Sequence, residues 1–506
     1  MDKPLEVFDR DFEWSALERF VSDDQQGATL GVVSGRRRQG KTFLLEAMSQ
    51  AAQGFYFGAT EATDAESLSR MSTALTEHLA PASPFHFANW AEAVDALLDL
   101  GGERPVPVVI DEFPYLVKAN PELPSVIQQA LRPFGRARSQ TRTRLLLCGS
   151  ALTVMGKLLS GTAPLRGRAG LELVIPPLDY RLAARFWGIS DPQLAIRVYA
   201  IVGGTPAYRR EFIRSDAPAG PDDFDAWVIR TVLNPETPLF REGRYLLAEE
   251  SDMRDTALYH SVLAAVAEGN GTRGAIATYV GRKDADIAHP INVLEDAGLI
   301  VREPDAFRER RSTYQIAEPL IAFYHAIMRP AWSQLERPGN AARVWRASGE
   351  RFSKKVLGPR FEQVCRAWTL NFADPDGLGG LPAHVGEGVV NDAAGKSVHQ
   401  VDVVVAGVAD GGKTPLLAIG EAKWGEVMDI RHLKRLKQVR SLLEAIGRYD
   451  VRQTKLMCFS GAGFSESLRE AAAADDGPLL VGASELYDLP GSSPGVIGED
   501  FRGDHP

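Results

Sequence analysis

Residues 35–42 read Gly-Arg-Arg-Arg-Gln-Gly-Lys-Thr, and this stretch decides the fold of the first part of the chain. It follows an apolar run, residues 28–33, and opens onto a predicted helix over residues 43–50. The spacing G-x-x-x-x-G-K-[ST] is that of a phosphate-binding loop, because its glycines let backbone N–H groups turn inward around a polyphosphate at the positive end of the following helix. The sequence therefore predicts a nucleotide site within a strand–loop–helix unit.

The loop supplies most of the expected nucleotide contacts. Lys41 is predicted to meet the β- and γ-phosphates and to act in catalysis, and Thr42 is predicted to bind magnesium. The remaining contacts expected from this stretch come from Gly35, Gln39, Gly40 and Phe43.

Length and composition limit the possible classes of protein. A chain of 506 residues is too long for one hydrophobic core and indicates roughly three to four domains. The charged start, residues 1–10, lacks an apolar signal region, and no apolar run is long enough to span a membrane, so we expect a cytoplasmic protein. Three distant cysteines exclude a disulfide framework, and a net charge of −9 confines any DNA contact to local basic patches.

A second element of the nucleotide site is predicted at residues 106–113. This apolar strand ends in Asp-Glu, where Asp111 can hold magnesium and Glu112 can polarise the attacking water. A further strand, residues 145–148, ends before Ser150, which is expected to sense the γ-phosphate from between the two elements. Strands that alternate with helices predict an α/β fold with a parallel sheet and ligands at the carboxyl ends of its strands.

Two arginines follow in a glycine-containing turn. Arg166 and Arg168 could contact the γ-phosphate of the same subunit or of a neighbouring one, which makes a homo-oligomer plausible. Two surface arginines in a turn are the alternative interpretation.

These segments resemble the archaeal-type ATPases, which are P-loop proteins related to the STAND and AAA+ classes. The resemblance is carried by residues 35–42, 110–113, 149–150, 164–168 and the Gly-Gly-Thr-Pro-Ala-Tyr segment at 203–208. It implies a P-loop ATPase core over residues 1–175, a helical lid over 176–250, and Pro206 close to the nucleotide base. It also implies ATP as the nucleotide, and a role for ATP as a switch.

Residues 251–330 are predicted to form a winged helix. Three helices, at 255–268, 272–280 and 284–297, precede two strands that bracket a polar tip at 304–312. The third helix could enter a major groove while the wing touches phosphate. The alternative is that this module packs against the ATPase or a partner.

The carboxyl-terminal part begins after an expected linker at 331–350. Glu362 lies on a predicted helix, Asp402 in a strand, and Glu421, Ala422 and Lys423 at the end of a second strand. Because side chains two apart on a strand share a face, Glu421 and Lys423 point the same way, and an adjacent antiparallel strand can bring Asp402 beside them. Two carboxylates for magnesium and a lysine near a scissile phosphate make a phosphodiester-cleaving site.

Residues 351–490 resemble the PD-(D/E)xK nuclease superfamily, with an α/β restriction-endonuclease-like fold. The resemblance implies that Asp402, Glu421 and the Ala422 carbonyl bind metal, that Glu362 completes or orients the site, and that Lys423 positions the nucleophilic water. Val401 stands where the superfamily has proline. A basic amphipathic helix at 429–448 could track a DNA backbone or be a solvated face, and residues 491–506 are expected to be a flexible tail.

Together these features predict an ATP-binding and ATP-hydrolysing protein that controls a magnesium-dependent DNA nuclease, with the winged helix positioning DNA or a partner. The alternative is a regulatory ATPase switch whose terminal domain binds nucleic acid or protein without cutting. A DNA-remodelling motor ranks lowest, because the sequence has no helicase motif set.

Overall fold

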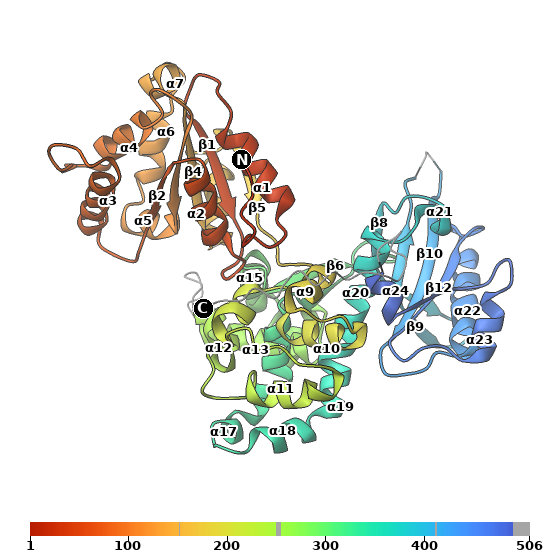
Figure 1. Cartoon of the computed structure of the whole chain (residues 1–506). Coiled ribbons are helices and arrows are strands. Elements are labelled where there is room, and N and C mark those ends of the chain that lie inside the picture. The colour runs from red at the N-terminus through yellow and green to blue at the C-terminus, as the bar shows by residue number, and fades with distance from the viewer. Residues whose placement is uncertain (151, 249–254, 410–411, 489–506) are drawn as a thin grey trace.

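The computed structural model describes residues 1–150, 152–248, 255–409 and 412–488. Figure 1 shows three bodies: an amino-terminal α/β body, a central group of helices, and a carboxyl-terminal α/β body. The tail expected at 491–506 lies outside the described residues. Among the residues described, no helix combines the length and the apolar character needed to cross a bilayer.

The amino-terminal body is built on five parallel strands in the order β2-β3-β4-β1-β5. In that order the strands span Phe55–Gly58, Val106–Asp111, Thr143–Gly149, Thr29–Ser34 and Ala169–Val174. β4 pairs with β1 on one side and with β3 on the other. The predicted parallel sheet is therefore confirmed, and Ser150 follows a strand that lies between the phosphate loop and the Asp-Glu pair.

Helices cover both faces of this sheet because its central strands are apolar on both sides. The helices α1 (Asp11–Val21) and α2 (Lys41–Ala51) pack on one face. The other face is covered by α3 (Asp64–Leu79), α4 (Trp90–Asp99), α5 (Phe113–Ala119), α6 (Leu123–Ala130), α7 (Arg136–Gln140) and α8 (Leu152–Leu159). The carboxyl ends of the strands stay open toward the central helices (Figure 1).

The central group begins with the expected lid. Its helices are α9 (Tyr180–Trp187), α10 (Pro192–Val202), the π-helix η1 (Tyr208–Phe212), the short 3-10 helix η2 (Pro221–Asp223), α11 (Phe224–Arg230) and α12 (Pro238–Ala248).

Residues 331–350, expected to be a linker, belong to this group instead. They form α17 (Trp332–Leu335), α18 (Ala341–Ala347) and the start of α19 (Gly349–Phe352). The indole of Trp345 is buried, packs against the ring of Phe224, and donates a 3.0 Å hydrogen bond to Asp225 on α11. The linker prediction is wrong because the aromatic side chains of this segment complete the core of the lid.

The next module has the predicted order of three helices and a hairpin. It contains α13 (Thr256–Ala267), α14 (Arg273–Val280) and α15 (Asp284–Asp296), followed by the antiparallel pair β6 (Ile300–Pro304) and β7 (Ser312–Ile316). The chain then returns to the lid through α16 (Pro319–Phe323), η3 (Tyr324–Met328) and η4 (Arg329–Ala331).

The hairpin tip between β6 and β7 is docked on the carboxyl-terminal body. Phe307 is 8% exposed and belongs to the hydrophobic core of that body, where its ring packs edge-on against Tyr449. The backbone N–H of Ala306 donates to the carbonyl of Glu387 at 2.9 Å. A side chain added at Gly388 would come within 2.4 Å of the Phe307 ring. The tip thus packs against the carboxyl-terminal body, whereas the sequence led us to expect contact with phosphate, or packing of the module against the ATPase or a partner.

The carboxyl-terminal body contains a mixed sheet in the order β13-β12-β10-β9-β8, with β11 beside β10. In chain order its strands are β8 (His384–Asp392), β9 (Ser397–Ala406), β10 (Thr414–Lys423), β11 (Tyr449–Asp450), β12 (Lys455–Ser460) and β13 (Leu479–Gly482). β10 runs antiparallel to β9 and parallel to β12. The main helices are α20 (Gly358–Asn371), which follows η5 (Ser353–Leu357), and α22 (Ile430–Ile446), with α21 (Pro375–Leu378), α23 (Glu466–Ala472) and α24 (Ala483–Tyr487) at the periphery.

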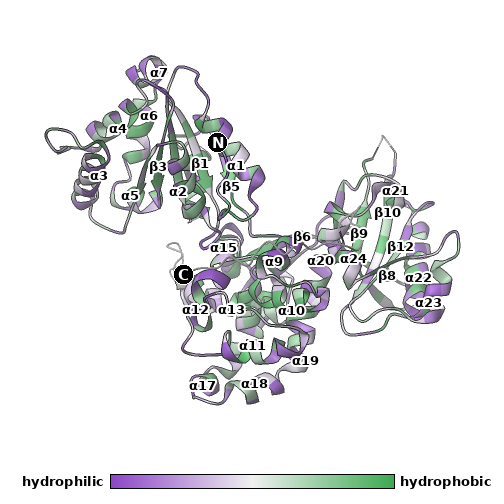
Figure 2. Ribbon diagram, viewed as in Figure 1, coloured by the Kyte–Doolittle hydropathy of each residue, from purple (hydrophilic) through white to green (hydrophobic). Residues whose placement is uncertain are grey.

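One hydrophobic core joins the lid to the carboxyl-terminal sheet. Buried residues of α9 and α10, such as Tyr180 and Ile201, belong to the same cluster as Phe361 on α20 and Val403 on β9. Figure 2 shows that hydrophobic residues are concentrated in the strands of both sheets and in the inner turns of the central helices. The lid and the carboxyl-terminal domain are therefore packed as one unit.

Candidate functional site: a phosphate loop and a distant acidic cluster

The phosphate loop has the backbone conformation that its glycines permit. Gly35 and Gly40 have φ values of 153° and 82°, in the region that favours glycine. Between them the Lys41 ammonium donates to the carbonyl of Arg36 at 2.7 Å, and its burial lowers the pKa of Lys41. The end of the loop and the start of α2 line one cleft with Gln39, Gly40, Lys41, Thr42 and Phe43, whereas Gly35 does not line it.

The two side chains predicted to hold magnesium are in contact. The Thr42 hydroxyl donates to Oδ2 of Asp111 at 2.7 Å, and the Tyr56 hydroxyl donates to the same oxygen at 2.8 Å. Asp111 is 2% exposed, so its carboxylate is held in a fixed place beside the loop. Hard oxygen donors beside a phosphate loop suit Mg²⁺, which is commonly bound by one or two carboxylates together with phosphate oxygens.

Glu112 and Ser150 form a second contact at the ends of β3 and β4. The Ser150 hydroxyl lies 3.0 Å from each carboxylate oxygen of Glu112, and Arg37 donates to the same hydroxyl at 3.3 Å. Arg37 also donates to the Tyr115 hydroxyl at 3.1 Å. The predicted sensor and the predicted water-polarising carboxylate are therefore direct partners. Tyr56, Arg37 and Tyr115 are site residues that the sequence did not reveal.

A cleft of about 740 Å³ opens beside the loop and is large enough for a nucleotide. Its apolar wall includes Phe8, Phe186 and Pro206, and the rings of Phe8 and Phe186 meet edge to face at 5.2 Å. Phe43 also lines the cleft. Pro206 therefore lines the same cleft as the phosphate loop, and its contact with a nucleotide base stays a prediction.

Gly204, two residues before Pro206, allows the backbone to pass very close to the segment that joins β5 to α9. A side chain there would come within 1.8 Å of the Leu178 carbonyl oxygen. The next residue, Thr205, accepts a 3.2 Å hydrogen bond from the Gln39 side chain, so the lid touches the phosphate loop directly.

Two arginines of the loop also reach the central helices. Arg36 pairs with Glu318 at 2.6 Å, and Arg38 pairs with Glu242 on α12. Both carboxylates are almost fully buried, at 2% and 1% exposure. Breaking one side of such a pair leaves a buried charge, which costs about 3–5 kcal/mol. The loop conformation is thereby tied to the position of the lid.

Arg166 and Arg168 lie away from this cleft. Both are exposed in the turn before β5, and Arg166 donates to the carbonyl of Gly161 in its own turn. Neither lines the nucleotide cleft. In this arrangement Arg166 and Arg168 are therefore not placed to contact a γ-phosphate bound in the same subunit. Their contact with a neighbouring subunit stays a prediction.

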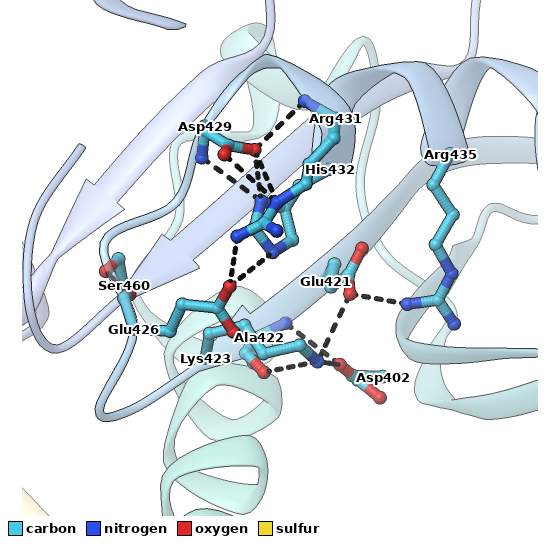
Figure 3. A network of polar contacts seen from close by, with 10 residues as sticks. All are labelled: Asp402, Glu421, Ala422, Lys423, Glu426, Asp429, Arg431, His432, Arg435 and Ser460. Atoms are coloured by element: carbon cyan, nitrogen blue, oxygen red, sulfur yellow. Dashed lines mark hydrogen bonds and ion pairs between the residues drawn. The ribbon is translucent and has the colours of Figure 1, made fainter. Parts of the chain in front are cut away.

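The residues predicted to bind metal in the carboxyl-terminal domain converge on one ammonium group. Lys423 Nζ lies 3.5 Å from Asp402 Oδ2, 3.2 Å from Glu421 Oε1 and 3.2 Å from the Ala422 carbonyl oxygen (Figure 3). The same oxygen, Asp402 Oδ2, also accepts a 2.9 Å hydrogen bond from the backbone N–H of Ala422. Two carboxylates and a carbonyl therefore surround the Lys423 ammonium, and metal binding by Asp402, Glu421 and Ala422 stays a prediction.

A divalent metal fits this arrangement. Glu421 is 3% exposed, and its Oε2 atom finds no hydrogen-bond partner among the described residues. A buried carboxylate oxygen without a partner is unfavourable unless a cation is nearby. Within the described chain no group of three or more His, Cys, Asp or Glu side chains is placed to bind a metal, so the set consists of two carboxylates and the Ala422 carbonyl.

Glu362 stands at the edge of this cluster, on α20. Burial and the nearby Asp402 carboxylate raise the pKa of Glu362 to about 8. Burial also raises the pKa of Asp402, although Lys423 opposes that change. Burial lowers the pKa of Lys423, but the carboxylates of Asp402 and Glu421 outweigh it and raise the net value. The Glu362 carboxyl group is therefore close enough to Asp402 for their charges to interact, and its role in the site stays a prediction.

Arg435 is a further member of the cluster. From α22 it donates to Glu421 Oε1 (Figure 3). It also donates to the carbonyl of Gln400 at 2.9 Å. The sequence placed Arg435 only in a basic helix face. Its position six residues into α22 puts it over the end of β10, a contact that depends on how the helix crosses the sheet.

The third helix of the central module is poorly suited to reading DNA. Its thirteen residues include four acidic residues and no lysine or arginine. Asp284, Asp286 and Asp296 are exposed, and phosphate would be repelled by them. The expectation that this helix enters a major groove finds no support in its surface charge.

Comparison with known proteins gives distant similarities. No family model matches the chain. An uncharacterized protein of Methanocaldococcus jannaschii is 27% identical over 332 residues, which cover 65% of this chain and 70% of that protein. The Walker-type ATPase of Pyrococcus abyssi has a TM-score of 0.47 and 19% identity, covering 64% of this chain and 97% of the other. The Aeropyrum pernix ORC2 protein has a TM-score of 0.43 and 14% identity, covering 69% and 96%. The activity of this chain is therefore inferred from its own residues.

Proposed function

We propose that this chain is an ATP-binding and ATP-hydrolysing switch that controls a magnesium-dependent DNA nuclease in its carboxyl-terminal domain. The observation that supports the nucleotide half is the contact between Thr42 and Asp111 beside Lys41, next to a cleft of about 740 Å³. The observation that supports the nuclease half is the convergence of Asp402, Glu421 and the Ala422 carbonyl on the ammonium group of Lys423.

At the nucleotide site, the roles follow from position. Lys41 and the loop amides bind phosphate, Thr42 and Asp111 would hold magnesium, and Glu112 is placed to orient the water that attacks the γ-phosphate. The Ser150 hydroxyl is hydrogen-bonded to Glu112 in this structure. Hydrolysis therefore requires this hydroxyl to give up a hydrogen bond to Glu112 and to contact phosphate instead. Such a requirement suits a slow switch.

At the acidic cluster, Asp402, Glu421 and the Ala422 carbonyl would hold magnesium, which activates water and neutralises developing charge when bound. Lys423 is positioned to stabilise the attacked phosphate, and Arg435 to hold Glu421 in place. Hydrolysis joins the water oxygen to phosphorus and breaks one P–O bond. The departing sugar oxygen takes a proton, and no oxidant or reductant is needed.

The connection between the two halves is the shared core of the lid. Phe186 of α9 lines the nucleotide cleft, while Tyr180 at the other end of α9 donates to the carbonyl of Leu486 at 2.7 Å. Arg181 donates to the same carbonyl at 2.7 Å. A change at the cleft that moves α9 therefore acts on the carboxyl-terminal domain.

The test is DNA cleavage by the full chain with Mg²⁺, with and without ATP. We expect cleavage by the wild type and none by Asp402→Ala or Lys423→Ala, while all three bind ATP equally. Equal cleavage by wild type and variants would remove the nuclease assignment. If the wild type binds DNA in an ATP-dependent way without cutting it, the protein is the alternative, a regulatory ATPase whose terminal domain only binds.

A further inference from the structure

A second cavity, of about 450 Å³, lies between the docked hairpin module and the carboxyl-terminal domain. One wall comes from the start of α14 and from β7, including Thr272 and Thr313. The other wall comes from η5, α20, β8 and β9, including Glu362, Gln363 and Gln400. The cavity therefore exists because the hairpin is docked.

This cavity opens beside the acidic cluster. Glu362 lies on its wall, and Gln400 is two residues before Asp402 on β9. Arg435 does not line the cavity, but it donates to the backbone carbonyl of Gln400 and to Glu421, so it connects the strand beside the cavity with the cluster. A chain that occupied the cavity would pass next to the predicted ligands.

The lining has the chemistry of a nucleic-acid site. Hydroxyl and amide side chains line it together with apolar ones, Tyr314 supplies an aromatic ring, and four cationic side chains contribute to the lining: Arg311, Lys354, Lys355 and Arg360. Arg311 and Lys354 pair with Asp305 and Glu350, and Lys355 and Arg360 donate to the carbonyls of Glu268 and Ala317. Two of its three carboxylates are occupied by protein groups: Asp305 accepts from the N–H groups of Phe307 and Val389, and Glu387 accepts from Thr313 and Gln315. Positive groups with an aromatic platform are typical of sites that bind a single strand.

The volume decides which form of DNA fits. A space of 450 Å³ can hold a short segment of one strand but not a duplex, whose major groove alone is about 12 Å wide. The docked tip prevents the cavity from widening, because Phe307 is anchored in the core of the carboxyl-terminal domain.

We infer that the substrate of the acidic cluster is single-stranded DNA, which enters through the cavity between the hairpin module and the carboxyl-terminal domain. This inference rests on the proposed nuclease function. Duplex DNA is then cut only at an end or tail that supplies a free strand. The bond changes are those of the hydrolysis described above.

The first experiment gives the full chain four DNA substrates with Mg²⁺ and ATP: a linear single strand, a blunt duplex, a duplex with a single-stranded tail, and a closed circular plasmid. We expect the single strand and the tail to be cut at least tenfold faster than the blunt duplex or the plasmid, and Asp402→Ala to cut none. If the blunt duplex and plasmid are cut as fast as the single strand while Asp402→Ala is inactive, the nuclease proposal stands and the single-strand inference fails.

The second experiment measures binding, which does not depend on cleavage. Lys354 is an exposed lysine on the cavity wall, and Lys413 is an exposed lysine before β10 that does not line it. We expect Lys354→Gln to weaken binding of a fluorescent single strand roughly threefold and to reduce its salt dependence, while Lys413→Gln has no effect. Equal binding by both variants and the wild type would overturn the cavity as the strand site, even if no DNA is cut.

Discussion

At the scale of single residues, the nucleotide site depends on Lys41. Its ammonium is buried and donates to the carbonyl of Arg36. Removing it takes away the positive charge that is predicted to bind phosphate, and the group it contacts, a carbonyl, carries no charge. We expect Lys41→Ala to weaken ATP binding about 10- to 150-fold, which corresponds to the 1.5–3 kcal/mol of a hydrogen bond to a charged group. Titration calorimetry measures the affinity, and an unchanged circular dichroism spectrum is the control. Wild-type affinity in the variant would contradict the assigned role.

Arg435 gives a second prediction at this scale. It is the partner of Glu421, whose other oxygen has none among the described residues. Arg435→Ala should weaken DNA cleavage by roughly tenfold or more through loss of the orientation of Glu421, as expected for groups that position a metal ligand. Arg435→Lys should recover part of the rate, and the neighbouring exposed Lys434→Ala is the matched control. An equal loss in both alanine variants would assign Arg435 to general DNA attraction instead.

The residues of the two sites also differ in whether the sequence alone could identify them. The loop, Asp111, Glu112, Glu421 and Lys423 could be identified because each lies in a short sequence motif, and Asp402 because it lies in the strand before that of Glu421 and Lys423. The contacts of Arg37, Tyr56 and Arg435 could not, because no motif fixes them and they form only after the elements pack.

At the scale of elements, the phosphate loop is tied to the central helices by buried ion pairs. Arg36→Ala leaves the Glu318 carboxylate buried without this partner, which should destabilise the contact by about 3–5 kcal/mol. The expected result is a lower midpoint of thermal unfolding, with a smaller loss in the double variant Arg36→Met/Glu318→Gln. If the double variant is less stable than Arg36→Ala, the pair is not the source of the effect.

The contact between α13 and η3 makes the fold sensitive to acid. Burial lowers the pKa of His260 from 6.5 to about 4, and burial likewise lowers the pKa of His325; their rings lie 5.6 Å apart, with Arg329 and Arg244 nearby. Below pH 6.5 the unfolded chain gains protons that the folded one does not, so stability falls as the pH decreases toward 4.

This acid sensitivity is measured by the urea midpoint between pH 7.5 and 4.5. In the double variant His260→Asn/His325→Phe we expect the midpoint to depend less on pH over that interval. An identical slope in wild type and variant would show that other groups cause the loss.

The elements themselves were predicted more fully than their packing. The parallel sheet, the three helices with a hairpin, and the antiparallel strands that carry Asp402 and Glu421 follow from the patterns in the sequence. The docking of the hairpin did not, although Phe307 is a single aromatic residue in a polar, arginine-rich turn and was a signal. Trp332 and Trp345 likewise marked residues 331–350 as part of a core.

At the scale of the whole molecule, the docked hairpin holds two bodies together. Phe307→Ala should remove about 3–5 kcal/mol of packing from the carboxyl-terminal core, as for other buried phenylalanines. We expect faster proteolysis within residues 304–312, unchanged ATP binding, and a relative gain in cleavage of duplex DNA. The exposed Phe134, which is 99% accessible, supplies the control Phe134→Ala. If Phe307→Ala is cleaved within residues 304–312 as slowly as the wild type, the docked arrangement is contradicted.

The common core of the lid and the carboxyl-terminal sheet also sets the order in which the molecule matures. Synthesis proceeds from the amino terminus, so the nucleotide cleft is translated before strands β9 and β10 leave the ribosome. Until they do, the inner surfaces of α9 and α10 lack their packing partners. A newborn chain therefore already contains the phosphate loop when the acidic cluster first forms, and a chain that ends before β9 exposes the apolar surface of α9 and α10.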